Sequence, residues 1–251
     1  MCYTFWSFSI FHFTFEFMKK KIAILGSTGS VGKNLLKIID KEKDKFKIIL
    51  LTANKNYKTV YAQAKKYKVK NLILTNKSSY EILKKKTRNT NLNVYCNFEH
   101  LKKIFKIKAD YVMSSIMGIE GLLPTYKIIK YTNNIAIANK ESIICAWNLI
   151  NHELLKNKTN FIPVDSEHFS IWYALNNRAE NKIRKIYITA SGGPLLNYPI
   201  KKFKNVKLKK VLKHPNWKMG KKITIDSSTM MNKVFEVIEA KKIFNLNYNK
   251  L

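Results

Sequence analysis

The sequence predicts an α/β fold, in which a doubly wound parallel sheet is followed by a second α/β domain. Short apolar runs alternate with helical patterns from Lys21 to Val164, and such alternation builds parallel sheets through right-handed crossovers. A glycine-rich turn, Gly26 to Gly32, follows the first apolar run and precedes a helical pattern. Glycines in that context let the backbone approach a dinucleotide diphosphate, so the first domain is expected to be of the Rossmann type.

Strands are expected where short runs of β-branched and other apolar residues end in turn residues. The first run, residues 21–25, precedes the glycine turn, and the second comprises residues 46–52. The remaining expected strands are residues 71–74, 93–95, 111–113, 134–138, 160–164 and 185–190.

Helices are expected between these runs, where apolar residues recur every three or four positions. The first helix follows the glycine turn and continues to Ile39. A late helix is expected to begin at Asp226, Ser227 and Ser228, which suit an N-cap, and to run toward Phe244. The other expected helices are residues 57–68, 78–86, 97–105 and 122–130.

The composition is that of a folded, strongly basic chain. Its 251 residues are 46% hydrophobic, with a formal net charge of +31, and it lacks the run of about 20 apolar residues that a membrane span needs. The charge is almost all lysine, since the arginines are Arg88, Arg178 and Arg184. Phosphate-reading surfaces favour arginine. The lysine bias therefore indicates an A/T-rich genome, with a nucleic-acid-binding protein as the alternative.

The first 17 residues differ from the rest, because they hold no lysine and many aromatic residues. They match neither a secretory signal nor a transit peptide, so residues 1–17 are expected to be a non-native or disordered extension before a natural start at Met18. The cysteines, Cys2, Cys96 and Cys145, are few and widely spaced. This pattern excludes a disulfide framework and indicates a reducing compartment.

The end of the second expected strand points to the cofactor. A NAD-binding fold usually places an acidic residue here for the ribose 2′-hydroxyl, but this sequence has Asn54, Lys55 and Asn56. Their donors and positive charge favour a 2′-phosphate, and hence NADP(H). The other interpretation is a polar loop in a lysine-rich chain.

Two further segments place polar groups where strands end, and a lysine-rich segment follows the second. Asn139, Lys140, Glu141 and Ser142 either meet a ligand or cap a helix. The turn from Ser191 to Pro194 can hold a phosphate through backbone amides and a hydroxyl. The lysine-rich segment after it, residues 195–213, ends near His214 and Trp217 and is interpreted as a lid or a plain surface loop.

A divalent metal site is one interpretation of the carboxylates. Asp165 and Glu167 lie two apart after a strand and point the same way, and Glu236 can supply a third oxygen donor. Such oxygen donors suit Mg²⁺ or Mn²⁺, and the alternative is an acidic turn that begins a helix. Asn232 and Lys233 share a helix face with Glu236. His168 is expected to be structural.

Six ordered motifs together resemble the 1-deoxy-D-xylulose 5-phosphate reductoisomerase family, from about Lys20 to the end of the chain. The motifs are GSTGSVG (26–32), ANKES (138–142), PVDSEH (163–168), SGGP (191–194), HPNWKMG (214–220) and DSSTMMNKVFE (226–236).

The resemblance implies a role for each matching residue. It implies that NADPH is bound by Thr28, Gly29, Ser30, Val31, Asn54, Lys55, Asn56, Asn139, Glu141 and Gly220. It implies that one Mg²⁺ or Mn²⁺ is bound by Asp165, Glu167 and Glu236. It implies that the substrate meets Lys140, Ser166, Glu167, Ser191, His214, Ser227, Asn232, Lys233 and Glu236, with Lys140, Glu167 and His214 in the chemistry and Trp217 on the covering flap.

The activity implied is rearrangement and NADPH-dependent reduction of 1-deoxy-D-xylulose 5-phosphate to 2-C-methyl-D-erythritol 4-phosphate, in non-mevalonate isoprenoid synthesis. The implied partners are this small phosphorylated sugar, no nucleic acid and no membrane, with a homodimer for full-length members. The bacterial cytoplasm is favoured over a plastid-type organelle. The rivals are another NADP-linked dehydrogenase, a basic nucleic-acid-binding protein and an inactive truncated remnant.

The resemblance also implies a domain plan. It comprises an NADPH-binding domain over residues 18–150 and a catalytic domain over residues 151–251, with a flexible loop at 195–219. Family members continue into a further helical region, so we expect a C-terminally truncated chain without that domain. Phe169, the loop residues Leu195 to Asn197, and the pair Val234 and Phe235 depart from the family pattern.

Overall fold

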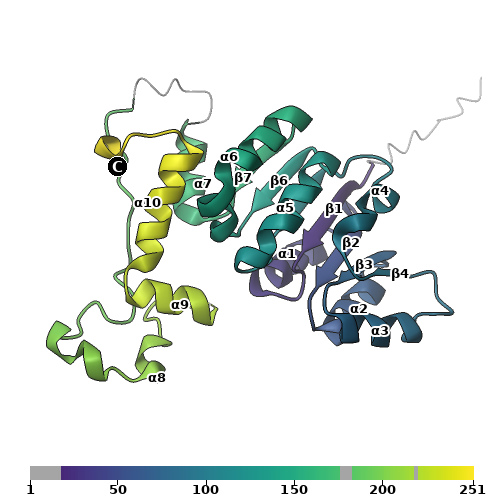
Figure 1. The fold of residues 1–251 in the computed structure, drawn as a ribbon, viewed down its shortest axis with the longest axis horizontal. Helices are drawn as coiled ribbons and strands as arrows, with labels where there is room; N and C mark the ends of the chain where they lie inside the picture. Colours follow the sequence, from purple (N-terminus) through teal and green to yellow (C-terminus); the bar gives the residue numbers. More distant parts are fainter. Residues whose placement is uncertain (1–17, 176–182, 218–219) are drawn as a thin grey trace, which may run out of the picture.

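A single parallel sheet organises the part of the chain that the computed structural model describes, residues 18–175, 183–217 and 220–251. Its order is β4-β3-β2-β1-β5-β6-β7, and every neighbouring pair is parallel (Figure 1). The strands are β1 Lys20–Leu25, β2 Phe46–Ala53, β3 Asn71–Leu74, β4 Asn93–Tyr95, β5 Tyr111–Ser114, β6 Asn134–Ile137 and β7 Asn160–Pro163.

Helices connect the strands, and further helices follow the last strand, β7. The connecting helices are α1 Ser30–Lys41, α2 Tyr57–Lys66, α3 Lys77–Lys86, α4 Leu101–Ile104, α5 Leu122–Ile128 and α6 Lys140–Asn157. After β7 come α7 Ser166–Leu175, α8 Leu208–Val211, α9 Lys221–Ser228 and α10 Met231–Ile243, with a 3₁₀ helix at Ile200–Asn205. Among the described residues, no helix is long and apolar enough to cross a membrane.

The core lies on both faces of the sheet because side chains alternate along each strand. In β1, Ala23 and Leu25 pack in one buried cluster, which includes Trp147 of α6. Ile22 and Ile24 pack in the other, with residues of α1 and α2. Parallel strands buried on both faces read as continuous apolar runs, which is why the sequence predicts them well.

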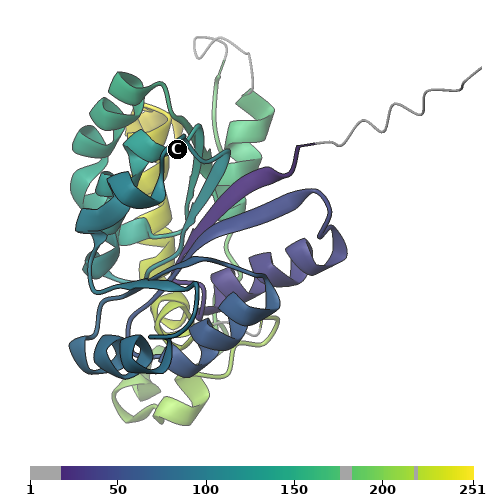
Figure 2. The same cartoon turned by 90° about the vertical axis from the view of Figure 1, so that its right-hand side faces the viewer.

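The residues after β7 form what we call the helical arm, residues 166–251 as far as they are described. In Figure 1 it lies beside the β7 edge of the sheet, and Figure 2 shows α10 (yellow) running alongside the teal helices. Helix α10 packs against α6, α7 and α9. The arm has a small cluster of its own, centred on Ala240, Phe244 and Leu246. Helix α6 therefore links the sheet to the arm.

The predicted order of strands and helices is confirmed through β7, but two predictions on the arm are wrong. Residues 185–190 form no strand, since no neighbouring strand of the described chain pairs with them. Ser228 ends α9 instead of beginning a helix, and its hydroxyl bonds back to the carbonyl of Ile225 at 2.7 Å. Residues 195–213 contain two short helical segments, and their role as a lid or a surface loop stays a prediction.

The predicted domain boundary stays a prediction. Helix α6 spans residue 150, and β7 extends the first sheet beyond it, so no element ends at that residue. The predicted extension, residues 1–17, lies outside the described residues, and so does part of the predicted loop, residues 218–219.

Candidate functional site

The glycine turn lies where the strand order reverses, between β1 and its neighbour β5. Gly26 has φ +79°, and a Cβ there would lie 2.8 Å from the carbonyl oxygen of Ser115. A Cβ on Gly32 would lie 2.6 Å from the carbonyl oxygen of Gly26. Only glycine fits at either position. The turn is therefore tight, at the place where open α/β sheets bind ligands.

The N-terminus of α1 is open to an anion. Its N-cap is Gly29, which provides no side-chain cap, and the first turn holds no acidic residue. Backbone N–H groups at such a terminus attract phosphate. Thr28 to Val31 all lie here, as predicted for a cofactor diphosphate. Ser27 is instead buried and bonded to Gln63 at 2.8 Å, which fixes the turn against α2.

The predicted 2′-phosphate residues follow β2 directly and are exposed. The Asn56 side chain caps α2 by accepting a hydrogen bond from the Thr59 backbone N–H at 3.1 Å. The Lys55 carbonyl accepts a hydrogen bond from Ser79 Oγ at 2.9 Å, while its side chain stays in solvent. Among the described residues, the side chains of Asn54 and Lys55 therefore have no hydrogen-bond partner, whereas Asn56 already has a structural one.

Asn139 is committed inside the protein. Its Nδ2 donates to the carbonyls of Ile116 and Gly118 at 2.6 and 2.7 Å, and its Oδ1 accepts from the Ser142 N–H at 2.6 Å. It therefore caps α6 and ties that helix to the turn after β5. The sequence left open whether this segment binds a ligand or caps a helix, and the Asn139 side chain serves the cap.

Next to it, Lys140 reaches from α6 into the arm. Its Nζ lies 2.6 Å from Asn232 Oδ1 and 3.4 Å from Asp165 Oδ2. Three segments that are distant in the sequence thus meet at one ammonium group. This places Lys140 beside the predicted metal ligands.

The three predicted metal-ligand carboxylates converge. Asp165 and Glu167 come from the start of α7 and Glu236 from α10, and one oxygen of each lies within 4.8 Å of the others. Lys233 Nζ bonds to Glu236 and lies 3.3 Å from Glu167 Oε1. Two lysines therefore offset the carboxylate charges, and the all-oxygen donor set fits a hard divalent cation such as Mg²⁺ or Mn²⁺.

The carboxylates differ in proton affinity. Burial and a hydrogen bond with Glu167 raise the pKa of Asp165. Burial also raises the pKa of Glu236, against the effect of Lys233. Burial would raise the pKa of Glu167 too, but bonds with Asp165 and Ser166 and the charge of Lys233 lower it to about 2. Glu167 is thus ionised at neutral pH, and protons compete with a cation more strongly at Asp165 and Glu236 than at Glu167.

The predicted phosphate residues form two groups. Ser191 Oγ lies 3.1 Å from His214 Nε2, and His214 Nδ1 accepts from the Trp217 N–H at 3.0 Å. Gly193, with φ +68°, packs so closely on the Ser227 backbone that a Cβ would overlap it. Ser191, His214 and Ser227 therefore share one corner. Asn232 and Lys233 lie on the carboxylate side, where Asn232 Nδ2 bonds to Glu236.

The flap residues are exposed. Trp217 is 63% exposed, and Gly220 forms the N-cap of α9 with open space where a Cβ would stand.

Lys222 bridges Glu141 of α6 at 2.7 Å and Asp226 at 2.8 Å. That bridge was not predicted, although Lys222 and Asp226 are four apart, a spacing at which helical ion pairs form. Although burial opposes it, the Lys222 hydrogen bond lowers the pKa of Glu141.

A second unpredicted residue is Glu239, which is buried on α10 beside His168. Its only sequence signal is its spacing of three from Glu236, which places both carboxyls on one face of the helix.

Comparison with known proteins gives one consistent family. A family model described as 1-deoxy-D-xylulose 5-phosphate reductoisomerase matches residues 22–147, and a model of the C-terminal domain of that enzyme matches residues 161–244. A relative of that name from Pelagibacter ubique (strain HTCC1062) is 61% identical and covers 92% of this chain. One from Sulfurihydrogenibium sp. (strain YO3AOP1) is 41% identical and also covers 92%.

Solved structures agree. A crystal structure of DOX-P reductoisomerase in complex with NADPH, fosmidomycin and magnesium has a TM-score of 0.84 and 33% identity over 92% of this chain. The reductoisomerase from Zymomonas mobilis in complex with NADPH has a TM-score of 0.82 and 33% identity, also over 92%. The chain spans 60% of the length of the Pelagibacter relative and of each of these two structures, and 59% of the Sulfurihydrogenibium relative.

Proposed function

Because the chain belongs to the 1-deoxy-D-xylulose 5-phosphate reductoisomerase family, we propose that it converts this sugar phosphate to 2-C-methyl-D-erythritol 4-phosphate with NADPH and a divalent cation. One observation carries the proposal, namely that Asp165, Glu167 and Glu236 converge from two separate segments beside Lys140. The glycine turn at the β1–β5 switch point supports the cofactor assignment.

The bound groups supply the difficult chemistry. A divalent cation acts as a Lewis acid on substrate oxygens, and NADPH supplies the hydride. The residues of the chain hold and orient them. Asp165, Glu167 and Glu236 would hold the cation, and the uncapped N-terminus of α1 would hold the NADPH diphosphate. The exposed side chains of Asn54 and Lys55 would meet the 2′-phosphate.

Lys140 is suited to orient the substrate and to stabilise charge on its oxygens. It is an ammonium group largely withdrawn from solvent, with an 11% exposed side chain, held between Asp165 and Asn232. A fixed cation in a partly dry site stabilises developing negative charge without reorganising. It therefore contributes beside the metal ligands without being one of them.

The corner formed by Ser191, Ser227 and His214 is suited to the substrate phosphate and backbone. Ser191 and His214 already hold each other in place at 3.1 Å. His214 Nδ1 accepts two backbone N–H groups, so its Nε2 carries the proton and can donate. Asn232 and Lys233 would complete the phosphate contacts from α10, and the exposed Trp217 would cover the bound sugar.

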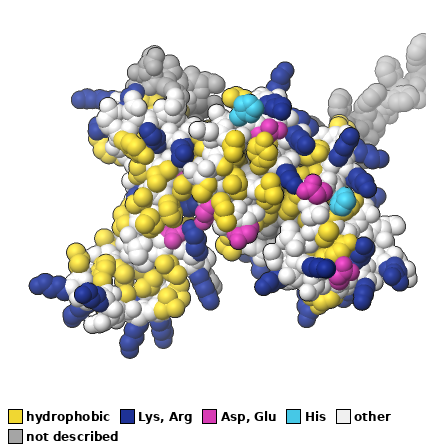
Figure 3. Space-filling view, viewed as in Figure 1, with side chains coloured by type: hydrophobic (Ala, Val, Ile, Leu, Met, Phe, Trp, Pro, Cys, Tyr) yellow, Lys and Arg dark blue, Asp and Glu magenta, His cyan; other side chains and the backbone are white. Residues whose placement is uncertain are grey.

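The expected partner is thus a small phosphorylated sugar, and a homodimer and the bacterial cytoplasm are the expected setting. Bacterial relatives such as that of Pelagibacter ubique support the setting. On the face in Figure 3, lysine and arginine side chains spread over sheet and arm alike, which favours general attraction of anions over a nucleic-acid groove.

A coupled set of measurements tests the proposal. The purified chain is incubated with 1-deoxy-D-xylulose 5-phosphate, NADPH and Mn²⁺, and absorbance at the nicotinamide band is followed. We expect oxidation of NADPH that stops on chelation of the metal and resumes when Mn²⁺ is restored. Tight NADPH and Mn²⁺ binding without turnover would instead identify an inactive remnant. Strong nucleic-acid binding with a steep salt dependence would favour the basic binding protein.

A further inference from the structure

His168 lies buried between the two segments that carry the proposed metal ligands. It is 1% exposed, on α7, and its Nε2 lies 2.9 Å from the backbone carbonyl oxygen of Glu236 on α10. A carbonyl oxygen only accepts, so Nε2 carries the proton and donates it. The neutral ring therefore has its lone pair on Nδ1, which needs a donor.

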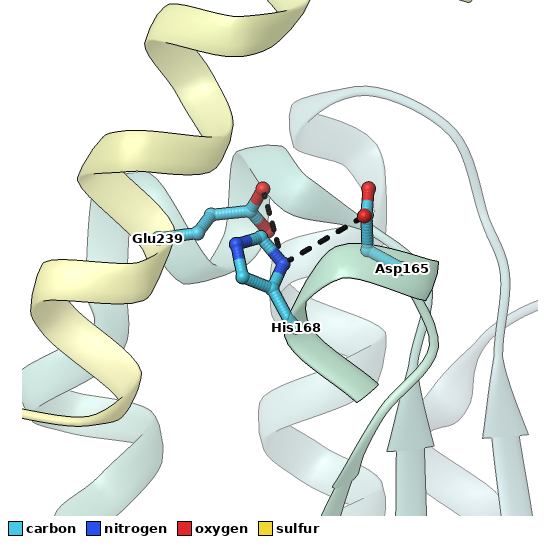
Figure 4. A group of neighbouring side chains, drawn as sticks. All are labelled: Asp165, His168 and Glu239. Carbon is cyan, nitrogen blue, oxygen red and sulfur yellow. Dashed lines mark ion pairs between the residues drawn. The ribbon is translucent and has the colours of Figure 1, made fainter. Parts of the chain in front are cut away.

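Two carboxyl groups face that lone pair. Asp165 Oδ1 and Glu239 Oε2 each lie 4.0 Å from His168 Nδ1, and Figure 4 shows them approaching the ring from α7 and α10. Glu239 is 2% exposed, and its Oε2 has no hydrogen-bond partner among the described residues. This unpartnered buried oxygen and the Nδ1 lone pair lie 4.0 Å apart, and a small rotation of the Glu239 side chain would let one shared proton satisfy both.

Glu239 is better placed than Asp165 to supply that proton. Asp165 is already held by Lys140 and by the backbone N–H of Glu167, on the side of the other carboxylates. Glu239 Oε2 has no such partner in the part of the chain that the structure describes. Burial raises the pKa of Glu239 to about 8, which agrees with a donor role for its carboxyl group.

We propose that Glu239 is a positioning residue of the metal site, which donates a hydrogen bond to His168 and thereby fixes α7 against α10. His168 in turn holds the Glu236 backbone through Nε2–H. This chain of contacts from Glu239 through His168 to the Glu236 backbone, which we call the brace, sets the distance between Glu236 and the pair Asp165 and Glu167. It therefore sets how well the three carboxylates fit a cation. The inference rests on the metal site proposed above. Partners of this kind behind metal ligands tune affinity without touching the ion.

The first experiment compares Glu239→Gln with Glu239→Leu in the full chain, by Mn²⁺ titration followed by electron paramagnetic resonance. The Gln amide keeps the size and can still donate to Nδ1, so Mn²⁺ affinity should stay within about threefold of the parent. Leu removes the donor, and affinity should fall about tenfold or more, the usual cost of losing such a partner. NADPH affinity should be unchanged in both. Glu81→Leu, at an exposed position on α3, is the surface control.

The outcomes separate the possible failures. Parent-like Mn²⁺ affinity in Glu239→Leu overturns the brace. If Glu239→Gln loses as much affinity as Glu239→Leu, or if a second bound ion disappears, Glu239 is a ligand and the positioning role is wrong. If Asp165→Asn and Glu236→Gln also bind Mn²⁺ like the parent, the metal site of the proposed function fails, whatever Glu239 does.

A measurement on the unaltered chain covers the case in which Glu239→Leu does not fold. With ¹⁵N-labelled histidine, nuclear magnetic resonance at neutral pH reports which nitrogen of His168 carries the proton. The brace requires a neutral ring protonated on Nε2, with Nδ1 accepting a hydrogen bond that Glu239→Gln retains. A ring protonated on Nδ1, or on both nitrogens, overturns it.

Discussion

The sheet region and the helical arm are held together by different kinds of contact. The sheet buries its strands on both faces, and its largest clusters hold residues such as Leu25, Leu50 and Ile135 with no exposed area. The arm has a cluster centred on three buried residues, while Tyr187 is 86% exposed. Its polar side chains, in contrast, form many hydrogen bonds and ion pairs with one another. The sheet provides stability and the glycine turn before α1, which we also call the glycine cradle. The arm provides charged side chains that pair with one another.

The largest expected effect compares the same substitution in the two regions. Leu25→Ala leaves a cavity in a close-packed core and should lower the free energy of unfolding by about 3–4 kcal/mol. Leu246→Ala removes a 5% exposed side chain from the small arm cluster, where collapse is easier, so about 2 kcal/mol is expected. Urea unfolding measures both. An equal or larger loss for Leu246→Ala would show that the arm is packed as tightly as the sheet.

The next effect separates the two regions by ligand. Glu236→Gln removes one anionic oxygen donor from the arm and should weaken Mn²⁺ binding about 100-fold, roughly 2.7 kcal/mol. NADPH binding should not change, because the glycine cradle lies in the sheet region. Calorimetric titration with each ligand tests this, with Glu81→Gln, at an exposed position on α3, as a control. Unaltered Mn²⁺ affinity would remove Glu236 from the site.

These two comparisons explain which features the sequence could predict. Strands such as β3 were predicted to the residue because a run buried on both faces is a local signal. The strand expected at residues 185–190 was wrong because a strand also needs a neighbour, which no local pattern reveals. Ser227 and Ser228 were placed at the wrong end of a helix, since hydroxyls can bond to backbone groups at either end.

In the site, too, features with a local sequence signal were predicted and features that depend on distant neighbours were missed. Asp165, Glu167 and Glu236 were predicted as a set by motif, and the structure brings their oxygens within 4.8 Å. Asn56 and Asn139 were predicted to contact the cofactor, but both side chains cap helices. Glu239 was missed because its chemistry depends on His168 and on burial between two helices. Neither factor can be read from the residues around it.

A pH titration sharpens the comparison through two buried acids. The pKa of Glu239 in the arm is raised by burial from 4.5 to about 8. A raised folded-state pKa gives stability that is complete below pH 4.5 and is lost as the pH rises through 8. Asp165 and Glu236 shift in the same direction. In chelator, the melting temperature should therefore fall across this window, and less so in Glu239→Gln.

A buried tyrosine of the sheet should respond at higher pH. Burial raises the pKa of Tyr111, on β5, from 10.0 to about 12. Its contribution is complete below pH 10 and is lost as the pH rises through 12. Tyr111→Phe should remove that loss while leaving the lower window intact. If Tyr111→Phe altered the lower window instead, the two regions would not titrate independently.

The smallest expected effect tests whether the sheet region selects the cofactor by charge. Lys55 is exposed and its side chain has no ion-pair partner among the described residues, so it is free to meet a 2′-phosphate. Lys55→Asp replaces attraction by repulsion, and NADPH affinity should fall about tenfold while NADH affinity changes little, since one exposed charge contact is worth about 1 kcal/mol. Fluorescence titration with both cofactors measures the ratio. Lys58→Asp, at an exposed lysine in the first turn of α2, is the control for a general change in charge. Equal losses in the two variants would mean that the net charge of the chain, and no specific contact at Lys55, attracts the cofactor. In that case the sheet region would contribute only its backbone cradle, and selection between the two cofactors would have to come from the exposed Asn54.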